Sequence, residues 1–182
     1  MPTNRLVRLN SVSGLIVSGL IVSGLLAGFG TLAPQALAAA PPPKLAPDLA
    51  LKSADGSVVQ LATYRGKVVI VDFWASWCVP CKASFPALDS LYREYGPRGL
   101  EVLAVNLDER RGDADTFLGA HPHRLMVLFD PEGASPVAFG VKGMPSSFLV
   151  DKAGSVRFTH MGYSGNVDQS YRREIAQLLT EP

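Results

Sequence analysis

The stretch that decides the fold reads Val68-Val-Ile-Val-Asp-Phe-Trp-Ala-Ser-Trp-Cys-Val-Pro-Cys81. Residues 68–74 are β-branched or aromatic apart from one aspartate, which is typical of a strand buried on both faces. From Val79 to about Tyr95, apolar residues recur at helical spacing, and Gly96-Pro97 ends that helix. The two cysteines are therefore expected where a buried strand passes into a helix.

That placement would give the cysteine pair its chemistry. The first turn of a helix has unpaired backbone N–H groups and the positive end of the helix dipole, which stabilise a thiolate at Cys78. Cys81 lies three residues later on the same helix face, close enough to resolve a mixed disulfide. Pro80 costs little so early in a helix, where its missing N–H would have no partner. We expect Cys78 to be the attacking sulfur.

Two other uses of the cysteines are disfavoured. A purely stabilising disulfide would close so short a loop that it would remove little entropy from the unfolded chain. A zinc site would need two more ligands, and the histidines lack the paired spacing of such sites. The three histidines are interpreted as surface or loop residues: His121, His123 and His160. We expect no metal at the cysteine pair.

Asp72 interrupts the apolar strand six residues before Cys78. A carboxylate is costly to bury, yet a run this apolar predicts burial, and the strand could place Asp72 beneath the cysteine pair. Burial favours the protonated carboxyl group, so our hypothesis is that Asp72 accepts a proton from Cys81 during resolution.

Gly143-Met144-Pro145-Ser146 precedes another predicted strand. Proline cannot donate to a strand ladder, so Pro145 is expected at the start of that strand. Both a cis Met144–Pro145 peptide bond and an ordinary turn are consistent with this stretch.

The remaining pattern alternates strands and helices. A hairpin is predicted around Asp55-Gly56, between 49–52 and 58–61. Further strands are expected at 100–107, 125–129, 147–150 and 156–159, and further helices at 112–120, 135–139 and 167–179, the last with Tyr171, Ile175, Leu178 and Leu179 facing inward. This order indicates an α/β sandwich with a mixed central sheet.

A leader precedes this domain. Arg5 and Arg8 are followed by no charged residue from Leu9 to Pro43, and Ala36-Leu-Ala38 has the small-x-small pattern of a cleavage site. We predict a signal peptide at 1–38; the alternative is an uncleaved membrane anchor through residues 9–30. An Ala/Pro linker at 39–44 would then join the leader to a domain at 45–182.

Composition excludes two classes of protein. The 182 residues are 47% hydrophobic and 18% charged, too apolar for a disordered chain. The formal net charge is +1, which provides no basic surface for nucleic acid. Cleavage after Ala38 would remove two of the 17 basic residues and none of the 16 acidic ones, changing that charge to −1.

The two quoted stretches, with Phe148-Leu-Val-Asp151 after the second, resemble the exported TlpA/ResA-like thiol–disulfide oxidoreductases of the thioredoxin superfamily. The resemblance covers about residues 45–180. It implies a thioredoxin-like three-layer sandwich with an N-terminal hairpin and an extra helix-plus-strand insertion between Asp108 and Asp130.

The resemblance also implies roles for residues. Cys78 would be the nucleophile and Cys81 the resolving thiol of a redox-active Cys78–Cys81 disulfide, and Pro145 a cis-proline beside them. The backbone of Met144 would pair with a client in strand fashion. The residues that would contact the client are Trp77, Val79, Pro80, Met144 and Pro145.

The chain departs from the family pattern at two positions. Ser84 stands where many members carry a glutamate thought to tune the cysteine pair. Asp72 stands where branch members often have a neutral residue and thioredoxin itself has aspartate, so proton handling would fall to Asp72. Pro86, by contrast, looks like the superfamily's helix-kinking proline.

The implied function is reduction of disulfides in client proteins, in the periplasm or otherwise outside the cytoplasmic membrane. By resemblance, a membrane thiol transporter would be the electron donor, and the clients would be apocytochromes c or copper-handling proteins. No dissociable cofactor is needed.

Three alternatives stand beside that interpretation. The first is an oxidant that introduces disulfides, which is disfavoured because Val79-Pro80 lacks the histidine of many strong oxidants. The second is a Cu(I) chaperone, in which Met144 or His160 would assist the two cysteines. A peroxidase is the weakest alternative, because no Pro-x-x-x-Thr-x-x-Cys stretch precedes Cys78.

Overall fold

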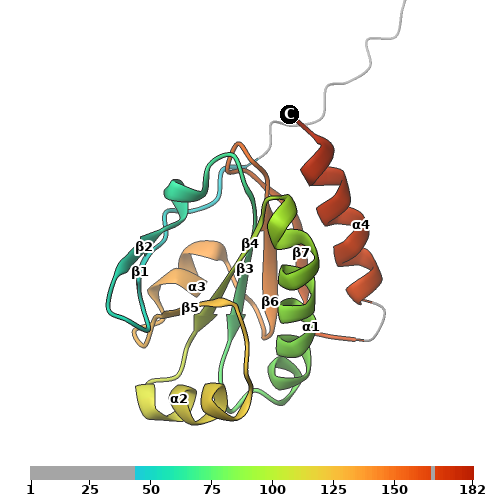
Figure 1. The fold of residues 1–182 in the computed structure, drawn as a ribbon. Coiled ribbons are helices and arrows are strands. Elements are labelled where there is room, and N and C mark those ends of the chain that lie inside the picture. Colours follow the sequence, from blue (N-terminus) through green and yellow to red (C-terminus); the bar gives the residue numbers. More distant parts are fainter. Residues whose placement is uncertain (1–43, 165–166) are drawn as a thin grey trace, which may run out of the picture. The chain divides into compact units, whose positions relative to one another are not determined.

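The computed structural model describes residues 44–164 and 167–182, which form one mixed β-sheet with helices on both faces (Figure 1). The sheet has seven strands in the order β2-β1-β5-β4-β3-β6-β7. The strands are β1 (Ala50–Ser53), β2 (Val58–Gln60), β3 (Val68–Trp74), β4 (Leu100–Asn106), β5 (Met126–Phe129), β6 (Ser146–Val150) and β7 (Val156–Met161). The helices are α1 (Val79–Tyr95), α2 (Arg111–Ala120), α3 (Ala134–Phe139) and α4 (Val167–Thr180), with short 3₁₀ turns η1 (Leu61–Tyr64) and η2 (Gly96–Arg98).

Strand β3 lies inside the sheet, between β4 and β6, and is buried at all seven positions. It pairs in parallel with β4 and antiparallel with β6. A parallel neighbour on one side requires a crossover connection, and α1 supplies it. The expected strand at 68–74 and the helix that follows it are confirmed.

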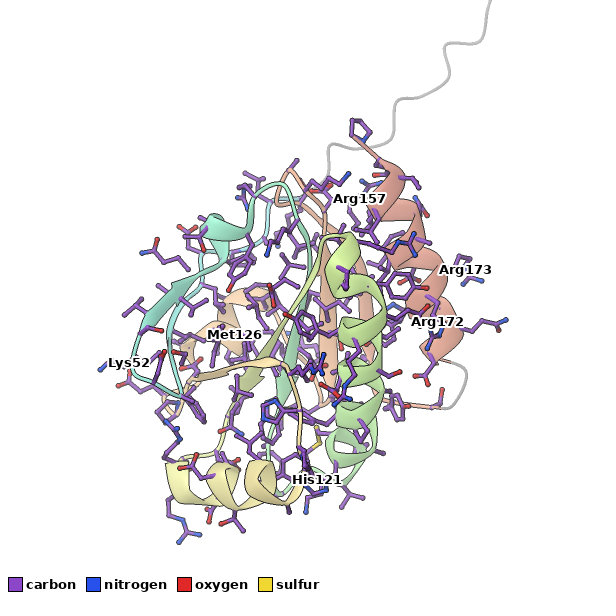
Figure 2. All side chains as sticks on the ribbon, viewed as in Figure 1. Lys52, His121, Met126, Arg157, Arg172 and Arg173 are labelled. Atoms are coloured by element: carbon purple, nitrogen blue, oxygen red, sulfur yellow. A yellow bond between two sulfur atoms is a disulfide. The ribbon has the colours of Figure 1, made fainter. Side chains whose placement is uncertain are left out.

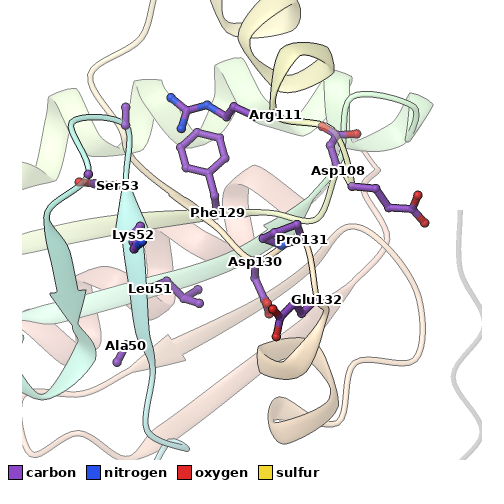
Figure 3. A pocket seen from close by; sticks show the side chains of 13 residues that line it. Ala50, Leu51, Lys52, Ser53, Asp108, Arg111, Phe129, Asp130, Pro131 and Glu132 are labelled. Atoms are coloured by element: carbon purple, nitrogen blue, oxygen red, sulfur yellow. The ribbon is translucent and has the colours of Figure 1, made fainter.

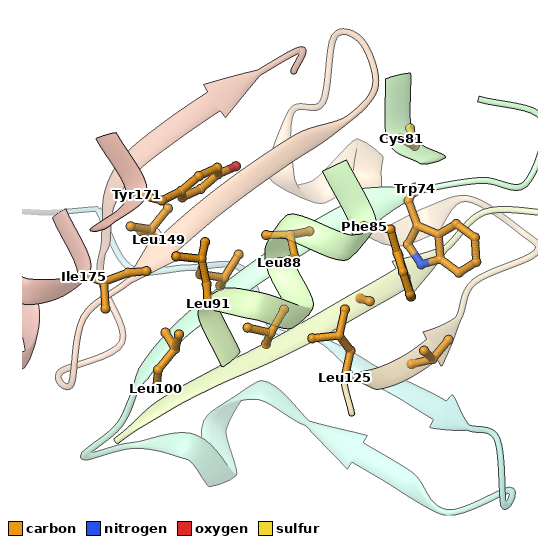
Figure 4. Close-up of a cluster of buried hydrophobic side chains, with 14 of the residues drawn as sticks. Trp74, Cys81, Phe85, Leu88, Leu91, Leu100, Leu125, Leu149, Tyr171 and Ile175 are labelled. Carbon is orange, nitrogen blue, oxygen red and sulfur yellow. The ribbon is translucent and has the colours of Figure 1, made fainter. Parts of the chain in front are cut away.

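The side chains of β3 alternate between two hydrophobic layers. Val68, Ile70 and Trp74 belong to a cluster shared with α1, α2 and α4 (Figure 4). Val69, Val71 and Phe73 belong to a second cluster on the other face, which includes Phe139 of α3. Helices therefore cover both faces of the sheet, and the expected thioredoxin-like three-layer sandwich is confirmed.

The two ends of the sheet are antiparallel hairpins. The predicted N-terminal hairpin is present as β1 and β2, and β1 also pairs antiparallel with β5. At the opposite edge, β6 and β7 form the second hairpin. Strand β7 extends two residues beyond the expected end at Thr159, to Met161.

The helix-plus-strand insertion expected between Asp108 and Asp130 is also present. Strand β5 pairs in parallel with β4 and lies between β4 and β1. Phe117 of α2 packs against Trp74 and Phe85, with ring centroids 5.1 and 5.4 Å apart. These contacts fasten the insertion to the start of α1.

Helix α4 covers the β6 and β7 side of the same face that α1 covers (Figure 1). Tyr171, Ile175 and Leu178 are buried, as their spacing predicted. Leu179 is only partly buried and packs against the cluster from its edge. Helix α4 thus encloses the core around β3 and β6.

The predicted signal peptide, its cleavage site, the alternative anchor at 9–30 and most of the 39–44 linker lie outside the described residues. Within residues 44–164 and 167–182, no helix has the length and apolar character needed to span a bilayer.

Candidate functional site

A disulfide joins Cys78 and Cys81 at the start of α1. Cys78 is the N-cap residue, and its sulfur accepts a hydrogen bond from the backbone N–H of Cys81 at 3.3 Å. A negative sulfur at this position would receive the same N–H and the favourable end of the helix dipole. The pair can therefore interconvert between a disulfide and a dithiol with a stabilised thiolate.

The two sulfur-bearing residues differ in exposure. Cys78 is 6% exposed, whereas Cys81 has no exposed surface. The residues beside Cys78 are open to solvent: Trp77 is 65% and Val79 is 74% exposed. Pro80 is exposed within the first turn of α1. Within the described residues, the exposed surface of the pair belongs to Cys78, so an incoming thiol or disulfide would reach it from that side.

Asp108 holds the loop in front of the cysteines, and sequence reasoning missed this role. Its carboxylate accepts hydrogen bonds from the backbone N–H and the hydroxyl of Ser76. Asn106 donates to the same carboxylate at 2.7 Å and accepts from the Asp108 backbone N–H. The available signal was an Asn-x-Asp pair at the end of a buried strand, where such side chains often hydrogen-bond to nearby backbone groups.

Asp72 is buried, with 1% of its surface exposed, as the sequence predicted. It shares a face of β3 with Ile70 and Trp74, the face that carries α1 and Cys81. Its Oδ1 accepts a hydrogen bond from Ser147 Oγ at 2.5 Å, and its Oδ2 has no hydrogen-bond partner. Burial raises the pKa of Asp72 to about 7, against the lowering effect of the Ser147 hydrogen bond.

The Met144–Pro145 peptide bond is cis and directly precedes β6. The carbonyl of Pro145 accepts a hydrogen bond from the N–H of Gly162, and the hydroxyl of Ser146 donates to the carbonyl of Gly143. Met144 packs against the hydrophobic cluster that contains both cysteines. The fold therefore brings this loop to the same end of the sheet as the disulfide.

Ser84, where the family resemblance led us to expect a glutamate, is buried. Its hydroxyl donates to the carbonyl of Cys81 at 3.0 Å. The hydroxyl is thus used inside the helix, three residues from Cys81. Pro86 lies inside α1, where the sequence placed it.

The interpretation of the histidines as surface or loop residues is wrong for His160 and incomplete for the other two. His160 lies on β7, where its Nε2 is 2.6 Å from Glu174 Oε2 and its ring packs on Tyr171. His121 stacks on Phe117, and His123 packs against Phe85. Each of the three histidine rings therefore packs on an aromatic side chain. In the described part of the chain, no three Cys, His, Asp or Glu side chains are grouped to hold a metal ion.

Two hollows open on the surface near this end of the sheet. One of about 590 Å³ lies between Trp77, Lys82 and residues of α2. The other, of about 430 Å³, lies between β1, β5 and the start of α2, where Arg111 covers the ring of Phe129 (Figure 3). No residue predicted for the site lines the second hollow.

The disulfide at the start of α1, the cis-proline loop before β6 and the three-layer sandwich together define a thioredoxin-like protein (Figure 2 shows its side chains). Residues 41–175 match the Redoxin family, and the chain belongs to that family. Within it, the chain is a TlpA/ResA-like member of the thioredoxin superfamily.

Particular relatives agree with this assignment. The "Thiol-disulfide oxidoreductase ResA" of Geobacillus thermodenitrificans is 36% identical over 112 residues, covering 62% of this chain and 64% of the relative. ResA of Bacillus subtilis is 31% identical over 111 residues, covering 61% and 62%. The chain thus matches slightly less than two thirds of the length of these curated relatives. A solved structure of a putative thiol:disulfide interchange protein DsbE from Chlorobium tepidum is 44% identical, with a TM-score of 0.73, and the match covers 75% of this chain and 96% of that one.

Proposed function

We propose that the chain is a thiol–disulfide oxidoreductase in which Cys78 and Cys81 alternate between dithiol and disulfide. The observation that carries this proposal is the disulfide at the N-terminus of α1, with Cys78 slightly exposed between exposed neighbours and Cys81 fully enclosed. That arrangement gives one sulfur access to other proteins and keeps the second for resolution. The relatives named for the same activity support it.

The proposed cycle transfers two electrons from the cysteine pair to a client disulfide. In the dithiol form, the Cys78 thiolate attacks one sulfur of a client disulfide, forming a mixed disulfide and releasing one client thiolate. Cys81 then gives its proton to Asp72, and its sulfur attacks the sulfur of Cys78. The second client thiolate leaves, and the Cys78–Cys81 disulfide forms. Two electrons pass to the client, and the two client sulfurs end as thiols after taking up protons.

The client would lie against Cys78 on the side of its exposed neighbours. Trp77 and Val79 are exposed there, with Pro80 beside them. The backbone of Met144, ahead of Pro145, would pair with an extended client segment as an added strand. We further propose that the protein acts outside the cytoplasmic membrane, with the leader at 1–38 directing export and a membrane thiol transporter re-reducing the pair. Apocytochromes c and copper-handling proteins are the proposed clients.

The direction of electron flow is tested by the reduction potential of the pair. The proposal of a reductant predicts a value near or below about −200 mV, because strong oxidants lie near about −120 mV. Equilibration of the full chain with glutathione or dithiothreitol buffers, followed by alkylation of free thiols, measures it. A potential near the upper value would overturn the reductant and favour an enzyme that introduces disulfides.

Client capture tests the exchange mechanism itself. A Cys81→Ser variant cannot resolve, so clients should accumulate as mixed disulfides on Cys78 and appear as thiol-sensitive adducts on non-reducing gels. Cys78→Ser is the matched control, because it keeps a cysteine at the enclosed position. If both variants yield the same adducts, the assignment of Cys78 as nucleophile fails.

A further inference from the structure

A row of polar side chains crosses three neighbouring strands beneath α4. Asp72 of β3 is paired with Ser147 of β6, and Ser147 is paired with His160 of β7. Directly paired residues point to the same face of a sheet. On this face α4 brings Tyr171 among otherwise apolar side chains (Figure 4). A polar row in a hydrophobic layer needs a reason beyond packing, because each polar group must be satisfied there.

The hydrogen bonds in this row run in one direction. The hydroxyl of Tyr171 donates to Ser147 Oγ at 2.6 Å, and Ser147 Oγ donates its single hydrogen to Asp72 Oδ1. The other carboxyl oxygen, Oδ2, is buried and has no partner. The two oxygens of Asp72 are therefore unequal: one is held by a donor, and the other is free to carry a proton.

We propose that Tyr171, acting through Ser147, is a positioning residue for Asp72: the pair keeps Oδ1 hydrogen-bonded, so that Oδ2 exchanges the proton with Cys81. This inference rests on the proposed function, since it assigns the residues that prepare Asp72 for resolution. The proton leaves the Cys81 thiol as its sulfur attacks Cys78 and returns to Cys81 when the disulfide is reduced.

The surroundings of Tyr171 fix its hydroxyl as a donor. The pKa of Tyr171 is raised above its ordinary value, first by burial and then by the negative charge of Asp72. Its ring packs on the ring of His160, with centroids 4.5 Å apart, and His160 is held in turn by Glu174. Helix α4 thus helps to orient the Asp72 carboxyl group on β3.

The groups around this row come from several elements. Strand β4 pairs Ala104 with Asp72, and Cys81 of α1 belongs to the hydrophobic cluster on the same face. From α4 the acidic side chains of Asp168 and Glu174 act on Tyr171, and β7 contributes His160. The donor from Ser147 favours the ionised form of Asp72, whereas burial favours the neutral form. Removing the donor should therefore make Asp72 hold its proton to higher pH.

The direct test follows the Asp72 carboxyl by ¹³C NMR during a pH titration of the full chain in its disulfide form. Loss of a hydrogen bond to a charged group should shift the Asp72 midpoint upward by about one pH unit or more in Ser147→Ala. Tyr171→Phe keeps the ring and removes only the hydroxyl, so the shift should be smaller and in the same direction. Tyr163→Phe is the matched control, because its hydroxyl donates to Asp168 on the same helix; it should leave the midpoint unchanged.

A kinetic test follows the reaction of the dithiol form with the disulfide 5,5′-dithiobis(2-nitrobenzoate). Release of the first thiolate reports attack by Cys78, and release of the second reports resolution by Cys81. The pH profile of the second step should move upward in both variants, while the first step keeps the wild-type profile. A merely structural role would not move one step alone.

The outcomes separate the two proposals. If the Asp72 midpoint in Ser147→Ala and Tyr171→Phe equals that of the wild type, the positioning role is wrong. If Ser147→Ala does not fold, Tyr171→Phe decides the question alone. If the wild type shows no second thiolate release, the proposed function fails, and the NMR titration still decides whether Tyr171 and Ser147 control Asp72.

Discussion

The carboxylate of Asp108 accepts hydrogen bonds from both the backbone N–H and the hydroxyl of Ser76, at 3.0 and 2.9 Å. Ser76 lies two residues before Cys78, so the end of β4 anchors the loop that leads into Cys78. In Asp108→Ala, Ser76 and Asn106 lose this partner. Because hydrogen bonds to charged groups are worth more than neutral ones, we expect the variant to lose about 2 kcal/mol of stability. Urea denaturation measures this loss.

The same variant should also expose the disulfide. A looser loop makes Cys78 easier to attack, so dithiothreitol should reduce the Asp108→Ala disulfide faster than the wild-type bond. Asp113→Ala is the control, because Asp113 pairs with Arg110 at the surface of α2 and should change stability by less than about 0.5 kcal/mol. Equal effects of the two substitutions would show that the brace on Ser76 is unimportant.

Asp72 should make the stability of the protein depend on pH in an unusual direction. The pKa of Asp72 is raised from 3.8 to about 7, so between these values the folded state binds more protons than the unfolded state. Its contribution is fully present below the unfolded value and is lost as pH rises through the folded one. Asp72→Asn should therefore gain stability relative to the wild type on going from pH 4 to pH 8, by on the order of 4 kcal/mol.

Urea denaturation of both proteins at the two pH values measures that gain. Titration of the other carboxyl groups affects both proteins alike and cancels in the comparison. A stability difference that stays the same at pH 4 and pH 8 would show that Asp72 has an ordinary pKa.

Phe85 connects α1 to the insertion. Its ring lies 5.0 Å from the ring of Trp74 and 5.4 Å from that of Phe117, and it is buried. Phe85→Ala should lower the free energy of unfolding by about 3–5 kcal/mol, because it leaves a cavity beside the rings of Trp74 and Phe117. Val79→Ala, at an exposed position of the same helix, should cost less than about 0.5 kcal/mol. Thermal or urea unfolding distinguishes the two, and a cost below about 1 kcal/mol for Phe85→Ala would contradict this packing.

Trp77 should affect clients more than folding. Its exposed ring lies beside Cys78, and aromatic side chains often dominate binding at interfaces. Trp77→Ala should lower kcat/KM for a protein disulfide about tenfold, the equivalent of about 1.4 kcal/mol. The effect on reaction with dithiothreitol should be much smaller. Val137→Ala, an exposed change on α3 of the opposite layer, is the control; a loss of equal size there would show that Trp77 has no special place in client binding.

Local sequence pattern was enough to predict the elements around the site. The continuous apolar run of β3 and the helical spacing after Cys78 each have one dominant physical explanation, and the structure agrees with both. The proline before β6 was consistent with a cis bond or an ordinary turn, and the structure has the cis bond. The burial of Asp72 followed from the same run.

The contacts of Asp72 could not be predicted in this way. Ser147 is 75 positions away in the sequence and reaches Asp72 only through the register of β3 and β6. His160 was misinterpreted because the apolar pattern of β7 ends before it, although the strand's pairing continues to Met161. The register between strands and the docking of a helix join residues far apart in the sequence, so a short stretch of sequence does not predict them.

The enclosure of Cys81 has a kinetic consequence for the proposed enzyme. With no surface of its own, Cys81 cannot form a mixed disulfide with another protein, so both halves of the cycle must pass through Cys78. The client that receives electrons and the donor that supplies them would then occupy the same surface in turn. Such an enzyme follows ping-pong kinetics, and at high concentration its oxidised client and its reductant compete for a single docking face.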